Sequence, residues 1–259
     1  MAYPYNFKVV VSGKHVEVYK YKKQVWREFE KKNFEDEKPQ KEPKQLNAFE
    51  QMEIMKQKQQ YSVNRTRTEI RRLINSNPQL TKFMTLTFAK NITDLKEANY
   101  IFNQFIKSMN YKYPDFKYLA IPEFQQRGAV HYHLLCEMPF IHFREIAEIW
   151  GQGNIDIRTL NDVDNIGAYV CKYLSKDMFD ERTFGKKKFF RSQSLSEPIE
   201  LLGYWAMKFV ERVCFALKPV FENKFESEWV GEVEYQAYKL DFIPFKRGKF
   251  ERSILFKPI

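Results

Sequence analysis

Two histidines and a carboxylate lie close together in the stretch 119–136, which reads LAIPEFQQRGAVHYHLLC. Residues 130–135 are expected to form a strand, in which successive side chains point to opposite faces, so His131 and His133 share one face. Two imidazoles on the same face suit a divalent cation. Glu123 supplies a third ligand if the preceding strand pairs in the right register. The stretch therefore predicts a hairpin that carries a metal site.

The turn of this hairpin decides the register. Residues 126–128 (QRG) suit a three-residue loop whose glycine takes the left-handed conformation. Such a loop pairs Glu123 with His131, and directly opposed residues share a face. A two-residue loop would pair Glu123 with Tyr132 and turn the carboxylate away from the histidines. The assignment also requires that the missing N–H of Pro122 face an edge or a bulge.

A second interpretation of the same residues remains open, because a His-x-His pair in an apolar strand is often structural. Two features favour the metal site. The chain has only four histidines, so two of them at strand spacing is a concentration. The second feature is a helix about forty residues downstream, whose side chains suit the same chemistry.

Residues 164–178 (DNIGAYVCKYLSKDM) are predicted to form an amphipathic helix. Its buried stripe comprises Ile166, Val170 and Leu174. On another face Tyr169 and Tyr173 lie one turn apart, and each is followed three residues later by a lysine, Lys172 or Lys176. A phenol with a pKa near 10 becomes a nucleophile when a metal polarises the electrophile and cations stabilise the phenolate. Aromatic packing with solvated lysines is the alternative.

Together these segments resemble the motifs of the HUH rolling-circle replication initiators. The segment 131–133 (HYH) is similar to the family's second motif, 169–176 (YVCKYLSK) to its third, and 83–88 (FMTLTF) to its opening strand. Glu123 matches the position where several initiators carry their third metal ligand. The paired tyrosines resemble the two-tyrosine branch, which includes proteins of microvirus-like phages and bacterial plasmids. The resemblance covers about residues 82–176.

The resemblance implies a metal-dependent transesterase that nicks single-stranded origin DNA and later rejoins strands. Glu123, His131 and His133 would hold Mg²⁺ or Mn²⁺. Tyr169 or Tyr173 would attack the scissile phosphorus, which gives a 5′-phosphotyrosine linkage and a free 3′-OH primer. The lysines Lys172 and Lys176 would neutralise the charge that develops on the phosphate.

Three other functions stay open at the level of the sequence. They are a transposase or relaxase-like nickase of the same chemistry, a non-catalytic origin-binding protein, and a hydrolase that uses water. No GxxxxGK[ST] loop occurs in the chain, so a host helicase would have to unwind the duplex and a host DNA polymerase would extend the primer.

The net charge of +10 and the aromatic content of 17% favour a polyanionic partner with bases to stack, and single-stranded DNA fits both. The candidate DNA-binding residues are Arg65, Arg67, Arg71, Arg72, Arg127, Lys186, Lys187, Lys188 and Arg191. We expect no membrane segment and a cytoplasmic location in a bacterial host, because no long apolar run or signal peptide occurs. The three cysteines Cys136, Cys171 and Cys214 lack CxxC spacing, which argues against a zinc finger or a disulfide framework. The oligomeric state is not indicated.

The predicted elements imply an α+β fold, a central antiparallel sheet with helices packed on one face, as in the RRM-like or ferredoxin-like core of HUH endonucleases. We expect a hairpin at 5–21, a charged linker at 22–44, helical structure at 46–75 with a break near 61–62, a strand at 81–88, helices at 94–109 and 143–150, a strand at 154–160, and a helix at 201–213. The expected divisions are residues 1–61 (hairpin, linker and helix), 62–200 (HUH nuclease domain) and 201–259 (C-terminal extension).

Overall fold

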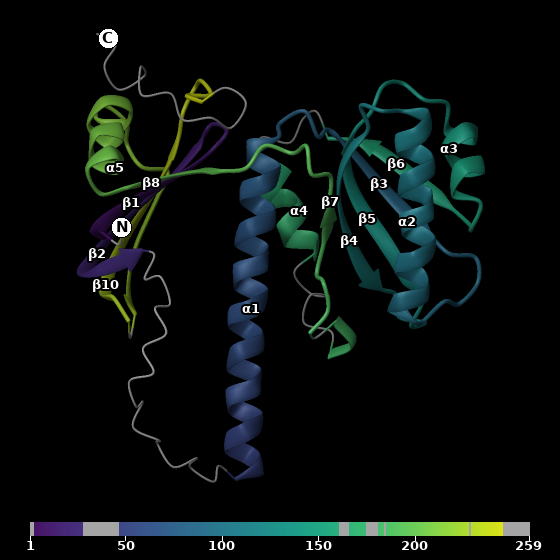
Figure 1. Cartoon of the computed structure of the whole chain (residues 1–259), viewed down its shortest axis with the longest axis horizontal. Coiled ribbons are helices and arrows are strands. Elements are labelled where there is room, and N and C mark those ends of the chain that lie inside the picture. The colour runs from purple at the N-terminus through teal and green to yellow at the C-terminus, as the bar shows by residue number, and fades with distance from the viewer. Residues whose placement is uncertain are drawn as a thin grey trace. The chain divides into compact units, whose positions relative to one another are not determined.

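The computed structural model of the chain describes residues 3–27, 47–160, 166–174, 181–183, 185–227 and 229–245. The chain divides into two compact units, one made of residues 1–53 with 196–259 and the other of residues 54–195. Each unit is built on a five-stranded antiparallel sheet, which confirms the α+β class (Figure 1). None of the described helices combines the length and apolarity needed to cross a membrane. The expected three-part division stays a prediction.

The sheet of the unit 54–195 carries the predicted hairpin at its centre. Its strands are β3 (Lys82–Thr87), β4 (Lys117–Phe124), β5 (Val130–Glu137), β6 (Ile155–Thr159) and β7 (Phe190–Arg191), in the order β6-β3-β5-β4-β7. Strand β5 therefore has a neighbour on each side. The strands expected at 81–88 and 154–160 are both confirmed to within one residue at each end.

Helices cover both faces of this sheet, whereas the sequence predicted one covered face. On one face α2 (Leu95–Lys112) and α3 (Phe143–Trp150) pack over a core that includes Leu86 and Tyr132. On the other face α1 (Ala48–Ser76) and α4 (Ile166–Leu174) pack over a core that includes Ile121 and Leu135. The physical reason is that β4 is apolar on both sides over residues 118–122, so both faces must be shielded from water.

The helix boundaries follow local signals closely. The carboxylate of Asp94 accepts a hydrogen bond from the backbone N–H of Lys96 (2.9 Å) and so caps α2, while Gly151, at φ 59°, ends α3. The break expected in the first helix near residues 61–62 does not occur. Helix α1 is continuous through Ser62, whose carbonyl accepts a hydrogen bond from the Thr66 hydroxyl (2.9 Å), because no proline or glycine interrupts it.

The second unit contains the other sheet, in the order β8-β1-β2-β10-β9. Its elements are β1 (Tyr3–Ser12), β2 (His15–Arg27), β8 (Ile199–Leu202), α5 (Gly203–Phe209), a π-helical turn (Val210–Cys214), β9 (Phe221–Ser227) and β10 (Gly231–Lys239). The expected N-terminal hairpin is confirmed. The linker prediction is wrong for Lys22–Arg27, which belongs to β2, and residues 28–44 lie outside the described residues. The helix predicted from 201 starts at 203, because β8 pairs with β1.

Gly153 is required where the chain after α3 crosses the end of β3. Its φ is 152°, and a Cβ there would lie 2.4 Å from the Thr87 carbonyl oxygen and 2.5 Å from the backbone nitrogen of Ala89. Gly185 also has a positive φ (69°), but a Cβ at that position would meet nothing within 4 Å. The two glycines therefore separate backbone strain from steric overlap.

We predict that Gly153→Ala lowers the free energy of unfolding by about 2 kcal/mol more than Gly185→Ala, because only the former forces two backbone segments apart. Urea unfolding of both variants measures the difference. Equal losses in the two variants would show that the close approach at Gly153 is not a constraint.

Candidate metal centre and tyrosine helix

The hairpin between β4 and β5 has the register that the three-residue loop predicts. The backbone N–H of Gln125 donates to the carbonyl of Ala129 (2.8 Å), and the N–H of Gly128 donates to the carbonyl of Gln125 (2.7 Å). Gly128 has φ 87°, which glycine adopts without a Cβ penalty. Glu123 consequently lies opposite His131, so the loop length places the carboxylate on the face of the histidines.

Pro122 fits this ladder because of where its backbone nitrogen points. In an antiparallel pair, residues that exchange hydrogen bonds alternate with residues that do not. Since Gln125 donates to the partner strand, Glu123 also faces β5, whereas Pro122 faces away from it. On that outer side β7 pairs only with Leu119 and Ala120 among the described residues. The missing N–H of Pro122 therefore breaks no bond of the β4–β5 ladder.

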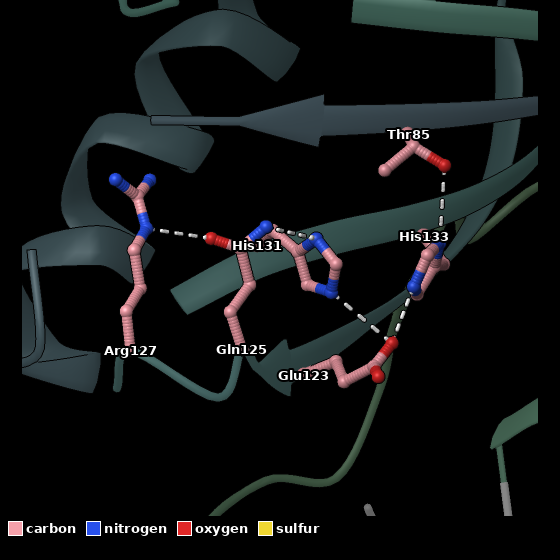
Figure 2. A network of polar contacts seen from close by, with 6 residues as sticks. All are labelled: Thr85, Glu123, Gln125, Arg127, His131 and His133. Carbon is pink, nitrogen blue, oxygen red and sulfur yellow. Dashed lines mark hydrogen bonds and ion pairs between the residues drawn. The ribbon is translucent and has the colours of Figure 1, made fainter. Parts of the chain in front are cut away.

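One carboxylate oxygen faces both imidazole rings (Figure 2). Oε2 of Glu123 lies 3.2 Å from Nε2 of His131 and also contacts Nε2 of His133. The ligand atoms of the three residues all lie within 4.8 Å of one another. The three side chains are between 13% and 22% exposed, so the cluster is shielded from water yet remains accessible. This Glu/His/His cluster could bind a metal ion.

The polar atoms of the cluster fit a cation. Nε2 of His131 is buried and makes no hydrogen bond within the described part of the chain, although the Glu123 oxygen is near. A buried polar atom without a hydrogen bond is unfavourable, and such atoms are uncommon in native proteins. A divalent cation among the carboxylate oxygen and the two Nε2 atoms would give each of them a partner.

The ring of His133 is held from its far side by β3. Its Nδ1 lies 3.1 Å from the hydroxyl of Thr85, the residue directly opposite it in the β3–β5 pair. The Phe83 ring stacks on the imidazole with 5.4 Å between ring centroids. A hydrogen bond to the outer nitrogen fixes the orientation of a ligand histidine and leaves Nε2 for the metal. The sequence did not identify Thr85, because its pairing with His133 joins segments 48 residues apart.

A second chain of contacts runs from His131 to the hairpin loop (Figure 2). The side-chain amide nitrogen of Gln125 lies 3.5 Å from Nδ1 of His131, and its oxygen accepts a hydrogen bond from Nε of Arg127 (2.9 Å). The same guanidinium donates to the carbonyl of Phe88 (2.7 Å). Arg127 was predicted to contact DNA; here it links the loop to the chain beyond β3.

The tyrosine helix α4 covers Ile166–Leu174 of the predicted 164–178. The ring of Tyr169 is 37% exposed, whereas Val170 and Cys171 are buried. Burial raises the pKa of the Cys171 thiol to about 11, which fits a packing role and not a nucleophile. Lys172 and Tyr173 belong to α4, but their side chains lie outside the described part, and so does Lys176 altogether.

The remaining candidate DNA-binding residues lie on two segments. On α1, Arg65 is exposed and Arg67, Arg71 and Arg72 are half-buried; around β7, Lys186 and Lys187 are exposed and Lys188 and Arg191 are half-buried. Lys188 donates to the Thr183 hydroxyl (3.0 Å), and burial lowers its pKa. One cation was missed: the Arg182 guanidinium lies 3.8 Å from the centroid of the Phe124 ring, beside the hairpin.

Comparison with known proteins identifies the same region. Residues 81–178 match the family described as replication-associated protein ORF2/gene-2 protein. The phasyl DNA replicon protein arp of Escherichia coli is 28% identical to the chain in an alignment that covers 36% of this chain and 42% of that protein. The chain thus matches less than half the length of this relative. No solved structure gives a significant match.

We predict that Thr85→Val weakens Mn²⁺ binding about tenfold or more, because the variant keeps the shape of the side chain but loses the hydroxyl that faces His133. Thr159→Val on β6 is the matched control, since the Thr159 hydroxyl accepts a hydrogen bond from Lys82 at the surface (2.7 Å). Calorimetric titration of both variants with Mn²⁺ measures the effect. Equal affinities in the two variants would exclude Thr85 as a support of the site.

Proposed function

We propose that this chain, which belongs through residues 81–178 to the ORF2/gene-2 family of replication-associated proteins, initiates replication of a phage or plasmid replicon by nicking single-stranded origin DNA. The observation that supports this most strongly is the convergence of Glu123, His131 and His133 on the sheet face that α4 also covers. Val170 and Cys171 of α4 share a core with residues of β4 and β5 on that face. The nucleophile helix and the ligand cluster thus belong to one packed unit.

Glu123, His131 and His133 would hold Mg²⁺ or Mn²⁺, for which a carboxylate with two imidazoles is a suitable donor set. The bound ion would act as a Lewis acid on the scissile phosphate. The protein's own contribution at this site is orientation: Thr85 holds His133, and the register of the hairpin holds Glu123.

The nucleophile would be the hydroxyl of Tyr169 or Tyr173. Its oxygen forms a bond to phosphorus while the bond from phosphorus to the 3′ oxygen breaks, and the phenolic proton is balanced by the proton that the released 3′-OH carries. The phosphate stays on the 5′ side as a phosphotyrosine, so the energy of the phosphodiester is retained for rejoining. With two tyrosines, one can open the parental junction and the other the regenerated origin.

Cations would complete the site and the path of the DNA. Lys172 and Lys176 lie three residues after each tyrosine and would offset the charge that develops on the phosphate. The arginines of α1 and the lysines before β7 would contact the backbone of single-stranded DNA, in keeping with a net charge of +10. A host helicase would unwind the duplex, and a host polymerase would extend the 3′-OH.

We predict that the protein forms a denaturation-resistant adduct with single-stranded DNA of its own replicon in the presence of Mn²⁺. The single variants Tyr169→Phe and Tyr173→Phe each lose either initiation or rejoining, and the double variant forms no adduct. Denaturing gels with labelled DNA measure this. Cleavage without any adduct would instead indicate a hydrolase that uses water, and binding without cleavage would indicate a non-catalytic origin-binding protein.

We further predict that the double variant His131→Ala, His133→Ala loses cleavage by at least about 10³-fold and loses Mn²⁺ binding, while its circular dichroism stays close to that of the parent. His142→Ala is the matched control, because His142 only caps α3 by accepting from the backbone N–H of Arg144 (3.3 Å). Retained cleavage in the double variant would remove the metal site from the mechanism.

A further inference from the structure

The helix that bears the tyrosines comes into backbone contact with α1. A Cβ on Gly167 would lie 2.5 Å from Oδ1 of Asn75 and 2.9 Å from the carbonyl oxygen of Arg71. Real Cβ atoms do not approach other atoms this closely, so a residue with a side chain would require one helix to move. Gly167 is buried in the first turn of α4, and the close approach therefore fixes where the helix begins.

A second contact one turn later fixes the direction of the helix pair. The Cys171 thiol donates to the carbonyl of Arg67 at 3.4 Å. Moving four residues forward on α4, from Gly167 to Cys171, corresponds to moving four residues back on α1, from Arg71 to Arg67. The two helices are therefore antiparallel and touch at two successive turns. Figure 1 shows α4 beside α1.

The tyrosines lie on the other side of this contact. Tyr169 follows Gly167 by two residues, which is about 200° around the helix axis, and its ring is exposed. Tyr173 lies one turn further along α4. Any movement of α4 away from α1 would consequently displace the tyrosine backbone by the same amount relative to the sheet that carries the ligand cluster.

We propose that Gly167 is a positioning residue, which seats α4 on α1 and so sets the place of the nucleophilic tyrosines relative to the candidate metal centre. This inference rests on the proposed function and assigns a role to α1 within it. Alanine would favour the helix by about 1 kcal/mol, so glycine at this helical position is explained by the contact and not by helix propensity. A displacement near 1 Å at the reacting atoms costs about 10²-fold in rate.

The test is the variant Gly167→Ala in the full chain, with three measurements. We expect the rate of adduct formation on single-stranded DNA to fall by about 10- to 100-fold, while Mn²⁺ affinity from calorimetric titration stays within about twofold. We also expect Cys171 to react faster with N-ethylmaleimide, because its thiol, now buried with a raised pKa, becomes accessible when α4 lifts from α1. Peptide mass spectrometry separates the labelling of Cys171 from that of Cys136 and Cys214.

Rescue distinguishes positioning from general damage. Asn75→Ala removes the atom nearest to the added Cβ, so the double variant Gly167→Ala, Asn75→Ala should regain part of the adduct rate and of the Cys171 protection. Should Gly167→Ala fail to fold, Cys171→Leu enlarges the same interface one turn on, and Cys171→Ala is its control. In that pair only the leucine variant should lose rate at unchanged Mn²⁺ affinity.

The two proposals fail in different ways. A wild-type rate of adduct formation in Gly167→Ala, or unchanged labelling of Cys171, overturns the positioning role even though the nickase stands. If the wild-type protein forms no adduct, the nickase proposal fails, and with it the catalytic meaning of the contact. Labelling of Cys171 then still shows whether Gly167 seats α4 on α1.

Discussion

The three-residue loop between β4 and β5 is the constraint on which the candidate site depends. The hydrogen bonds from Gln125 to Ala129 and from Gly128 to Gln125 set the register of the whole hairpin. A slip by one residue would turn Glu123 to the opposite face and separate it from His131. Since the same register also leaves Pro122 facing outward, the chemistry and the strand geometry impose one requirement.

The buried face of the sheet stabilises this register from behind. Tyr132 lies between the two histidines in sequence but on the other face, where its ring stacks on Phe102 at 4.2 Å and its hydroxyl donates to Oδ1 of Asn99 (2.7 Å). A tyrosine locked at both its ring and its hydroxyl cannot exchange faces with a histidine without leaving a cavity and an unpaired polar group. The α2 side of the sheet thus supplies rigidity, and the α1 side supplies the functional groups and the helix that bears the tyrosines.

What the sequence could predict follows from the range of the interactions. The turn at 126–128, the cap at Asp94 and the stop at Gly151 depend on neighbours within a few residues, and all three are confirmed. Contacts between distant segments were missed: Thr85 meets His133 only through β3–β5 pairing, and Gly167 meets α1 across more than ninety residues. The second covered face was also missed, although the apolar run 118–122 in β4 is the signal for it. Family resemblance, and not periodicity, assigned the tyrosines.

The central claim is that a tyrosine of α4 becomes covalently attached to DNA under the control of the Glu123, His131 and His133 cluster. The most direct measurement is peptide mass spectrometry of the protein after incubation with single-stranded DNA of its replicon and Mn²⁺, followed by nuclease digestion. The account predicts a nucleotide 5′-phosphate on the peptide that contains Tyr169 and Tyr173, absent when a chelator is present. A nucleotide on any other peptide, or the same adduct in the chelator, would contradict it.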